Sequence, residues 1–200
     1  MDALNGPTWA VALRPLPGEV ACGDAWRVRT FGEALLVVVV DGLGHGEQAE
    51  TAARVALATL EDAGDGSLPE LFTLCHRALA TTRGVAMTIA RIERGRLEWA
   101  GVGNIAVVLI PAASDAPRRH PLLVGGVVGY RCPPLLVRSV DVQPGDLLML
   151  VTDGIDPDWL PGPRSPFPTD GALDTLVSAV LHRWALPGDD ALVLAVRPVG

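Results

Sequence analysis

The segment from residue 35 to 60, LLVVVVDGLGHGEQAETAARVALATL, constrains the fold more than any other part of the chain. Residues 35–40 are all apolar, mostly β-branched and without helical spacing, which predicts a strand buried on both faces. This strand ends at Asp41, and glycines at 42, 44 and 46 allow a tight turn. From Glu47 onward apolar residues recur with helical spacing, which predicts a helix packed beside the strand.

Asp41 is therefore expected at the rim of the hydrophobic core. An unpaired carboxylate is costly to bury, so this side chain should meet water, backbone donors or a cation. The glycines that follow it would also let the backbone pass close to a small ligand.

The length and the cysteines indicate the class of protein. No internal repeat and no second hydrophobic core can be recognised in the 200 residues, which favours one domain spanning 1–200. Three cysteines at unrelated spacings are typical of a reducing compartment rather than of a disulfide framework. No apolar run approaches the ~20 residues that span a bilayer, and no signal segment opens the chain. We therefore expect a cytoplasmic, monomeric protein without a membrane partner.

The charged residues exclude several functions. The net charge is −7 and arginines form no continuous basic patch, so nucleic acid is not an expected partner. All 16 basic residues are arginine. The absence of lysine excludes the phosphate-binding lysine of a P-loop, a Schiff-base lysine and a Ser-x-x-Lys nucleophile pair. Any phosphate chemistry must use metal ions, arginine or backbone amides.

The rest of the chain is mostly short strands separated by turn residues. Strands are predicted at 8–14, 20–31, 85–92, 97–102, 105–110, 122–128, 135–142, 146–152 and 191–196, and further helices at 68–82 and 171–185. Gly103 and Asn104 are predicted to close a hairpin, and residues 157–168, with five prolines, to form a surface loop. This order lacks the alternation of a parallel doubly wound sheet. We expect an α+β fold, an α-β-β-α sandwich of two stacked antiparallel sheets flanked by helices.

Four acidic sites lie at or near the ends of apolar strands. They are Asp24, Asp41, Asp153 and the pair at 189 and 190. A single Asp-Gly pair is more often only a turn. Carboxylates gathered at one rim, however, repel each other unless cations lie between them, and hard divalent ions prefer oxygen ligands. If the four sites converge in the fold, they would form a metal site.

The motifs around these acids resemble a known family. They are Gly23-Asp24, V-D-G-L-G-H-G at 40–46, A-G-V-G-N at 100–104, P-G-D-L-L-M-L-V-T-D-G-I at 144–155 and G-D-D at 188–190. In this order the set resembles the metal-dependent serine/threonine protein phosphatases of the two-C type. It is most similar to the compact bacterial branch that includes SpoIIE and RsbX, and to RsbX in particular.

The resemblance implies a centre of two Mn²⁺ or Mg²⁺ ions, with the metal ligands Asp24, Asp41, the carbonyl of Gly42, Asp153 and Asp189. Asp41 would bridge both ions, and Asp41 and Asp153 would be the catalytic residues. In the last motif the family's ligand corresponds to the first acid, Asp189, with Asp190 beside it. Leu192 occupies a position where the family usually has a hydroxyl residue, which affects the expected geometry around Asp189.

The implied reaction is hydrolysis of phosphoserine or phosphothreonine by a water activated between the two ions. Arg14 and Arg27 are the candidates for holding the phosphate, whereas His45 is expected to make a loop contact because hard cations prefer oxygen. The implied substrate is a phosphorylated regulator, either a stressosome protein or an anti-sigma-factor antagonist.

Two other functions can be compared with the sequence. A nucleotide-binding turn at 42–46 is disfavoured because Glu47 replaces the last glycine of a G-x-G-x-x-G motif and Asp41 would repel a pyrophosphate. A catalytically inactive, phosphatase-like module that binds a phosphoprotein partner stays open, because Leu192 departs from the family pattern.

Overall fold

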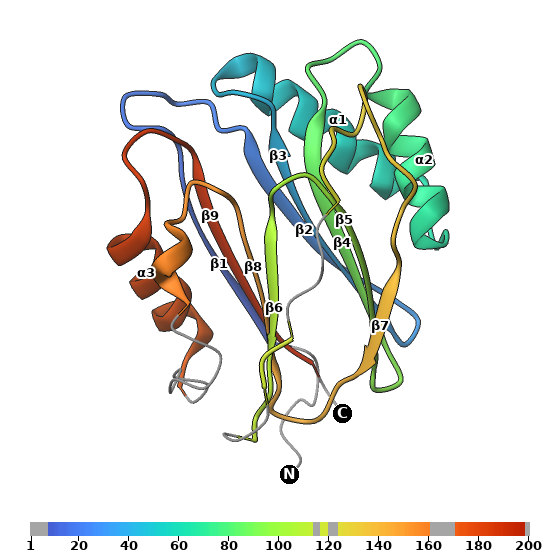
Figure 1. Cartoon of the computed structure of the whole chain (residues 1–200), viewed down its shortest axis with the longest axis vertical. Helices are drawn as coiled ribbons and strands as arrows, with labels where there is room; N and C mark the ends of the chain where they lie inside the picture. The colour runs from blue at the N-terminus through green and yellow to red at the C-terminus, as the bar shows by residue number, and fades with distance from the viewer. Residues whose placement is uncertain (1–7, 114–116, 120–123, 161–170, 199–200) are drawn as a thin grey trace.

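The computed structural model describes residues 8–113, 117–119, 124–160 and 171–198. Two antiparallel sheets are stacked on each other, with helices on both outer faces (Figure 1), so the predicted α-β-β-α sandwich is confirmed. One sheet has the order β1-β9-β8-β6, with the strands β1 (Thr8–Arg14), β9 (Ala191–Arg197), β8 (Leu147–Val151) and β6 (Ala106–Ile110). The other has the order β2-β3-β4-β5-β7, with the strands β2 (Asp24–Phe31), β3 (Ala34–Gly42), β4 (Val85–Glu93), β5 (Arg96–Val102) and β7 (Arg138–Asp141).

Strand β3 is buried on both faces, as its sequence predicts. Leu35, Val37 and Val39 point into the apolar layer between the two sheets. Leu36, Val38 and Val40 point to the opposite side and pack under helices. Since side chains alternate along a strand, an unbroken apolar run is what a strand with two covered faces requires.

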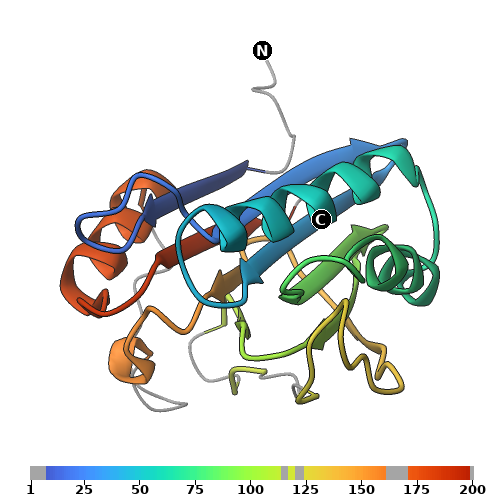
Figure 2. The same cartoon turned by 90° about the horizontal axis from the view of Figure 1, so that it is seen from above.

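The helices cover the two sheets separately (Figure 2). Helices α1 (Glu47–Asp62) and α2 (Leu68–Ala78) lie over the five-stranded sheet, and α3 (Leu173–Trp184) lies over the four-stranded sheet. The buried face of α1 is rich in alanine, which lets the helix approach β3 closely. At Gly42 a Cβ atom would lie 2.2 Å from the carbonyl oxygen of Ala49, so only glycine fits beneath the first turn of this helix.

Several predicted boundaries were wrong. β2 begins at Asp24, not at residue 20, because the Gly23 N–H donates to the Asp190 carboxylate instead of to a neighbouring strand. α2 ends at Ala78, and residues 124–128 form isolated bridges rather than a strand. Within the proline-rich stretch, Pro157–Trp159 form a short 3-10 helix (η1), while the predicted loop at 161–170 and the predicted strand residues 122–123 lie outside the described residues.

The link between β5 and β6 is not a hairpin. β5 pairs with β4 and β7, whereas β6 pairs with β8 in the other sheet. Gly103 and Asn104 therefore carry the chain from one sheet to the other. A short link between two apolar strands has the same local pattern whether it closes a hairpin or joins two sheets, so the sequence could not distinguish them.

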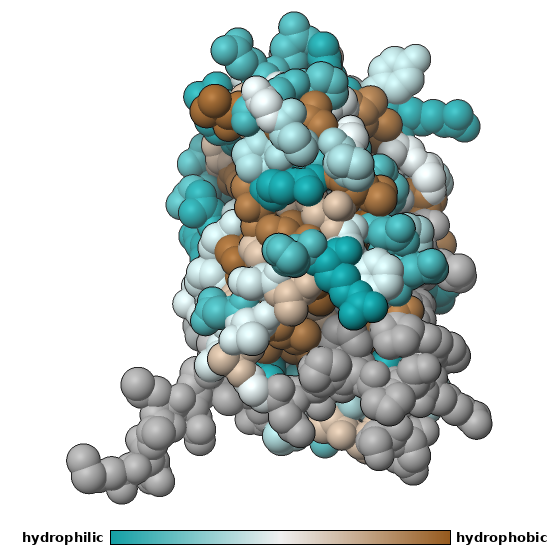
Figure 3. All heavy atoms as spheres, turned by 90° about the vertical axis from the view of Figure 1, so that its left-hand side faces the viewer, coloured by the Kyte–Doolittle hydropathy of each residue, from teal (hydrophilic) through white to brown (hydrophobic). Residues whose placement is uncertain are grey.

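The outer surface near α3 mixes hydrophobic and hydrophilic residues over its described part (Figure 3). Among the described helices, none is long and apolar enough to cross a membrane.

Candidate metal centre

The two sheets bring the start of β2, the end of β3, the end of β8 and the start of β9 to the same end of the sandwich, at the top in Figure 1. Asp24 on β2 and Asp41 on β3 are directly paired across neighbouring strands. Both share the face of Trp26 and Val39, which looks toward the other sheet. From that other sheet come Asp153, directly after β8, and Asp189, just before β9. Antiparallel pairing of β8 with β9 places the end of one beside the start of the other.

Three of the predicted ligands line one cavity of about 480 Å³. They are Asp41, Asp153 and Asp189, and the rest of the wall includes Asn104 and glycines at 44, 103, 125 and 126. Asp24 does not line this cavity but is buried beside Asp41. Gly42 ends β3, and its N–H donates to the Gly23 carbonyl at 3.0 Å.

Thr152 holds Asp24, a contact that the sequence reasoning missed. Its hydroxyl donates to Asp24 Oδ2 at 2.6 Å and accepts the Leu192 N–H at 2.9 Å. The Leu192 side chain itself is fully buried in the apolar layer between the sheets. A hydroxyl group therefore lies beside the predicted ligand Asp24, and it comes from Thr152 instead of from position 192. The alternation of β8 could have indicated this, because Thr152 falls on the face of Leu148 and Leu150.

Asn104 is a second residue that the sequence reasoning missed. Its Nδ2 donates to Asp153 Oδ2 at 2.5 Å, so the expected role as a hairpin residue alone was wrong. The bond fixes one oxygen of Asp153 at the cavity wall.

The two acids of the last motif have different surroundings. Asp190 is only 4% exposed, and its two oxygens accept the N–H groups of Leu16 and Gly23, each at 2.7 Å. It therefore ties the loop between β1 and β2 to the start of β9. Asp189 is partly exposed, accepts the Asp190 N–H and lines the cavity.

Neither predicted phosphate-holding arginine lines this cavity. Arg14 donates to the carbonyl oxygens of Leu186 and Asp189, so it supports the loop before β9. Arg27 lies on the helix-covered side of β2 and pairs with Glu61 of α1. His45 makes a loop contact, as expected, with its Nδ1 2.5 Å from Glu19 Oε1.

The carboxylates are held in an unfavourable electrostatic environment. Burial, and then the neighbouring acids, raise the pKa of Asp41 to about 9. Burial also raises the pKa of Asp24 to about 8, although the bond from Thr152 opposes this shift. The pKa of Asp189 is raised as well, mainly by burial. Each charge in this group would be stabilised by a nearby cation.

This donor set fits hard divalent ions, because it consists of carboxylate oxygens that repel one another. The carboxylates are not grouped as closely as the ligands of a bound ion. Within the described ranges, no three His, Cys, Asp or Glu side chains are grouped closely enough to hold a metal ion.

We expect the metal-free protein to lose stability as the pH rises. Asp24 and Asp41 have folded pKa values of about 8 and about 9, above the ordinary 3.8, so the folded state binds more protons than the unfolded state. Their contribution to stability is complete below about pH 4 and is lost as the pH rises through these folded values. Urea unfolding in a chelator between about pH 5 and 9 measures this trend. Saturating Mn²⁺ should counteract the loss, and a metal-free protein that gains stability over this interval would contradict the expectation.

Over residues 32–198 the sequence matches the family described as Stage II sporulation protein E (SpoIIE). The chain belongs to the SpoIIE family. A curated relative of this SpoIIE-family chain is the phosphoserine phosphatase RsbX of Bacillus subtilis (strain 168), which is 23% identical over 141 residues and 70% of each sequence.

Solved structures share the fold of this SpoIIE-family chain. A structure from work on the bacterial stressosome has 32% identity and a TM-score of 0.85, covering 96% of this chain and 99% of its own. RsbX in complex with magnesium has 19% identity and a TM-score of 0.83, and the match covers 98% of this chain and 97% of the RsbX chain. The PP2C phosphatase domain of SpoIIE from Bacillus subtilis has 18% identity and a TM-score of 0.75, and the match covers 96% of this chain and 61% of the SpoIIE chain. The predicted two-C type fold and bacterial branch are therefore confirmed.

Proposed function

We propose that this chain is a metal-dependent phosphoserine/phosphothreonine protein phosphatase. The observation that carries the proposal is the convergence of acids from both sheets, three of which line one cavity. Family membership supports the reaction class. The complete absence of lysine agrees with phosphate chemistry that depends on metal ions and arginine.

Two Mn²⁺ or Mg²⁺ ions would be held by Asp41, Asp153, Asp189 and Asp24, with the Gly42 carbonyl as a further ligand. Such ions, when bound, supply a nucleophilic water at neutral pH and stabilise charge on the phosphoryl oxygens. Asp41 would serve both ions, because it is paired with Asp24 on the neighbouring strand and lines the cavity together with Asp153 and Asp189.

The chain's other residues support this centre. Thr152 holds one oxygen of Asp24, and Asn104 holds one oxygen of Asp153, so each bond fixes the orientation of a carboxylate. The glycines of the cavity wall let neighbouring segments of backbone approach closely. At Gly103, for example, a Cβ atom would lie 2.4 Å from the Cβ of Ala86, so the two strands' ends pack against each other with no side chain between them.

The proposed substrate is a phosphorylated regulatory protein, either a stressosome component or an anti-sigma-factor antagonist. Support comes from the similarity to RsbX and to the structure from work on the stressosome. Monomeric state and cytoplasmic location remain predictions. Size-exclusion chromatography tests the first of them.

The decisive assay uses the purified chain on a phosphoserine peptide with Mn²⁺, with Mg²⁺ and with EDTA. We expect phosphate release only with a divalent ion. Equal release in EDTA would overturn the metal-dependent mechanism. Tight binding of the peptide without release would favour the inactive phosphoprotein-binding module. A phosphorylated stressosome protein and a phosphorylated anti-sigma-factor antagonist, compared at equal concentration, then test the substrate.

A further inference from the structure

We propose that Arg83 binds the phosphoryl group of the substrate at the entrance of the cavity. This inference rests on the proposed phosphatase function and adds to it a phosphate-binding residue. The two arginines expected from the sequence, Arg14 and Arg27, are engaged elsewhere, so the role is unassigned.

Arg83 lies where two walls of the cavity meet, in the turn between α2 and β4. The carbonyl of the next residue, Gly84, accepts the Leu43 N–H at 3.1 Å. On its other side Gly84 packs so closely against Val127 that a Cβ atom would lie 2.5 Å from Val127 Cγ1. Leu43 and Val127 both line the cavity. The backbone at 83–84 is therefore held at the rim from both sides.

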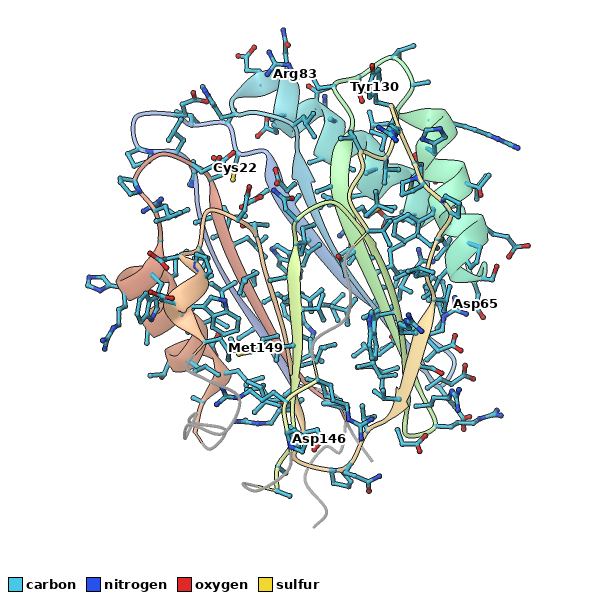
Figure 4. All side chains as sticks on the ribbon, in the orientation of Figure 1. Cys22, Asp65, Arg83, Tyr130, Asp146 and Met149 are labelled. Carbon is cyan, nitrogen blue, oxygen red and sulfur yellow. The ribbon has the colours of Figure 1, made fainter. Side chains whose placement is uncertain are left out.

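The guanidinium of Arg83 reaches over the glycine turn that follows Asp41. A Cβ atom at Gly44 would lie 2.9 Å from Arg83 Nη1, and Gly44 itself lines the cavity. With φ at 81°, this position also disfavours any side chain. The lack of a side chain at Gly44 therefore leaves space that the Arg83 guanidinium occupies. Figure 4 labels Arg83 at the upper end of the molecule, near the start of α1 and at the same end as Cys22, which precedes the Gly23-Asp24 motif.

The charge of Arg83 has no partner within the part of the chain that the structure describes. Its side chain is exposed, and none of the ion pairs or hydrogen bonds among the described residues includes it. By contrast, Arg27, Arg91 and Arg94 each pair with a carboxylate. A guanidinium presents donors in a planar fork that matches two phosphate oxygens. Beside a cavity lined by acids, such a free cation is suited to hold an incoming phosphate dianion.

Arg83→Ala and Arg83→Lys test this proposal, with Arg54→Ala as the matched control. Arg54 is exposed on α1, so its replacement removes the same charge away from the rim. In the Mn²⁺-loaded protein we expect Arg83→Ala to weaken binding of inorganic phosphate about 10- to 100-fold by calorimetry. The KM for a phosphoserine peptide should rise by a similar factor. The phosphate affinity and the KM of Arg83→Lys should lie between those of the wild type and of Arg83→Ala, because lysine keeps the positive charge but lacks the planar set of donors of a guanidinium.

Mn²⁺ affinity should be the same in the wild type and in the three variants, since Arg83 contacts no proposed ligand side chain. Phosphate binding and KM of Arg83→Ala equal to those of Arg54→Ala would overturn the role of Arg83 while leaving the phosphatase proposal intact. A wild-type chain that binds phosphate through Arg83 but releases none from the peptide would instead contradict the phosphatase proposal alone. Loss of Mn²⁺ affinity in Arg83→Ala would also count against the inference, because the effect would then lie in the metal centre.

Discussion

Replacing Asp41 by asparagine is expected to lower Mn²⁺-dependent phosphatase activity at least about a thousandfold while making the metal-free protein more stable. Charge stabilisation by a metal centre amounts to several kcal/mol, and each ~1.4 kcal/mol corresponds to a factor of ten in rate. Loss of the bridging carboxylate should remove most of that effect. Asparagine has nearly the same shape, so the packing around β3 should be unchanged.

The gain in stability follows from the electrostatics of the folded state. Burial and the neighbouring acids raise the pKa of Asp41 to about 9, so ionisation is strongly disfavoured in the folded protein at pH 8. A neutral amide avoids that penalty, and we expect a gain of about 1 kcal/mol or more in the free energy of unfolding. Chemical unfolding in EDTA measures the gain, and the phosphopeptide assay measures the loss of activity.

The matched control is Asp62→Asn at the exposed end of α1, which removes one carboxylate charge away from the cavity. Its activity should equal that of the wild type, and its stability should change by no more than about 0.5 kcal/mol. Activity of Asp41→Asn within tenfold of the wild type would exclude Asp41 as a bridging ligand. A less stable metal-free Asp41→Asn protein would show that the carboxylate is already paired in the folded state.

The sequence was most informative where structure depends on local pattern. β3 and α1 were predicted correctly because six apolar residues need two covered faces and because the alanines of the helix repeat with its period. The ends of β3, β8 and β9 also deliver the acids to one end, as proposed from their positions.

The contacts between distant segments could not be predicted in the same way. Asn104 reaches Asp153 because β5 and β6 belong to different sheets, and no local signal distinguishes that link from a hairpin. Thr152 bonds Asp24 across 128 positions of sequence, so the contact depends on how the sheets stack. Arg83 was overlooked because its place at the cavity rim depends on the packing of Gly84 against two other loops. These positions are set by tertiary packing, which single-sequence patterns do not encode.

Asp189→Ala is expected to affect metal binding and Asp190→Ala to affect stability, although the two residues are adjacent. Asp190 accepts the buried N–H of Gly23 and the part-buried N–H of Leu16, and its removal takes away the acceptor of both donors. Since each bond to a charged group contributes about 1.5–3 kcal/mol, Asp190→Ala should destabilise the protein by about 3 kcal/mol or more. Asp189 lines the cavity and has a raised pKa, so its removal should change stability little.

The response to Mn²⁺ separates the two roles. Mn²⁺ stabilises the folded protein in proportion to its affinity, so its addition should raise the unfolding midpoint of the wild type. In Asp190→Ala, assayed at a temperature where it is folded, that rise should persist because the cavity acids are intact. In Asp189→Ala the rise should largely disappear, and activity should fall about a hundredfold or more as one ligand is lost. If the metal response disappears with Asp190 and persists without Asp189, the second acid of the motif is the ligand, and the loop between β1 and β2 must release it when the ions bind.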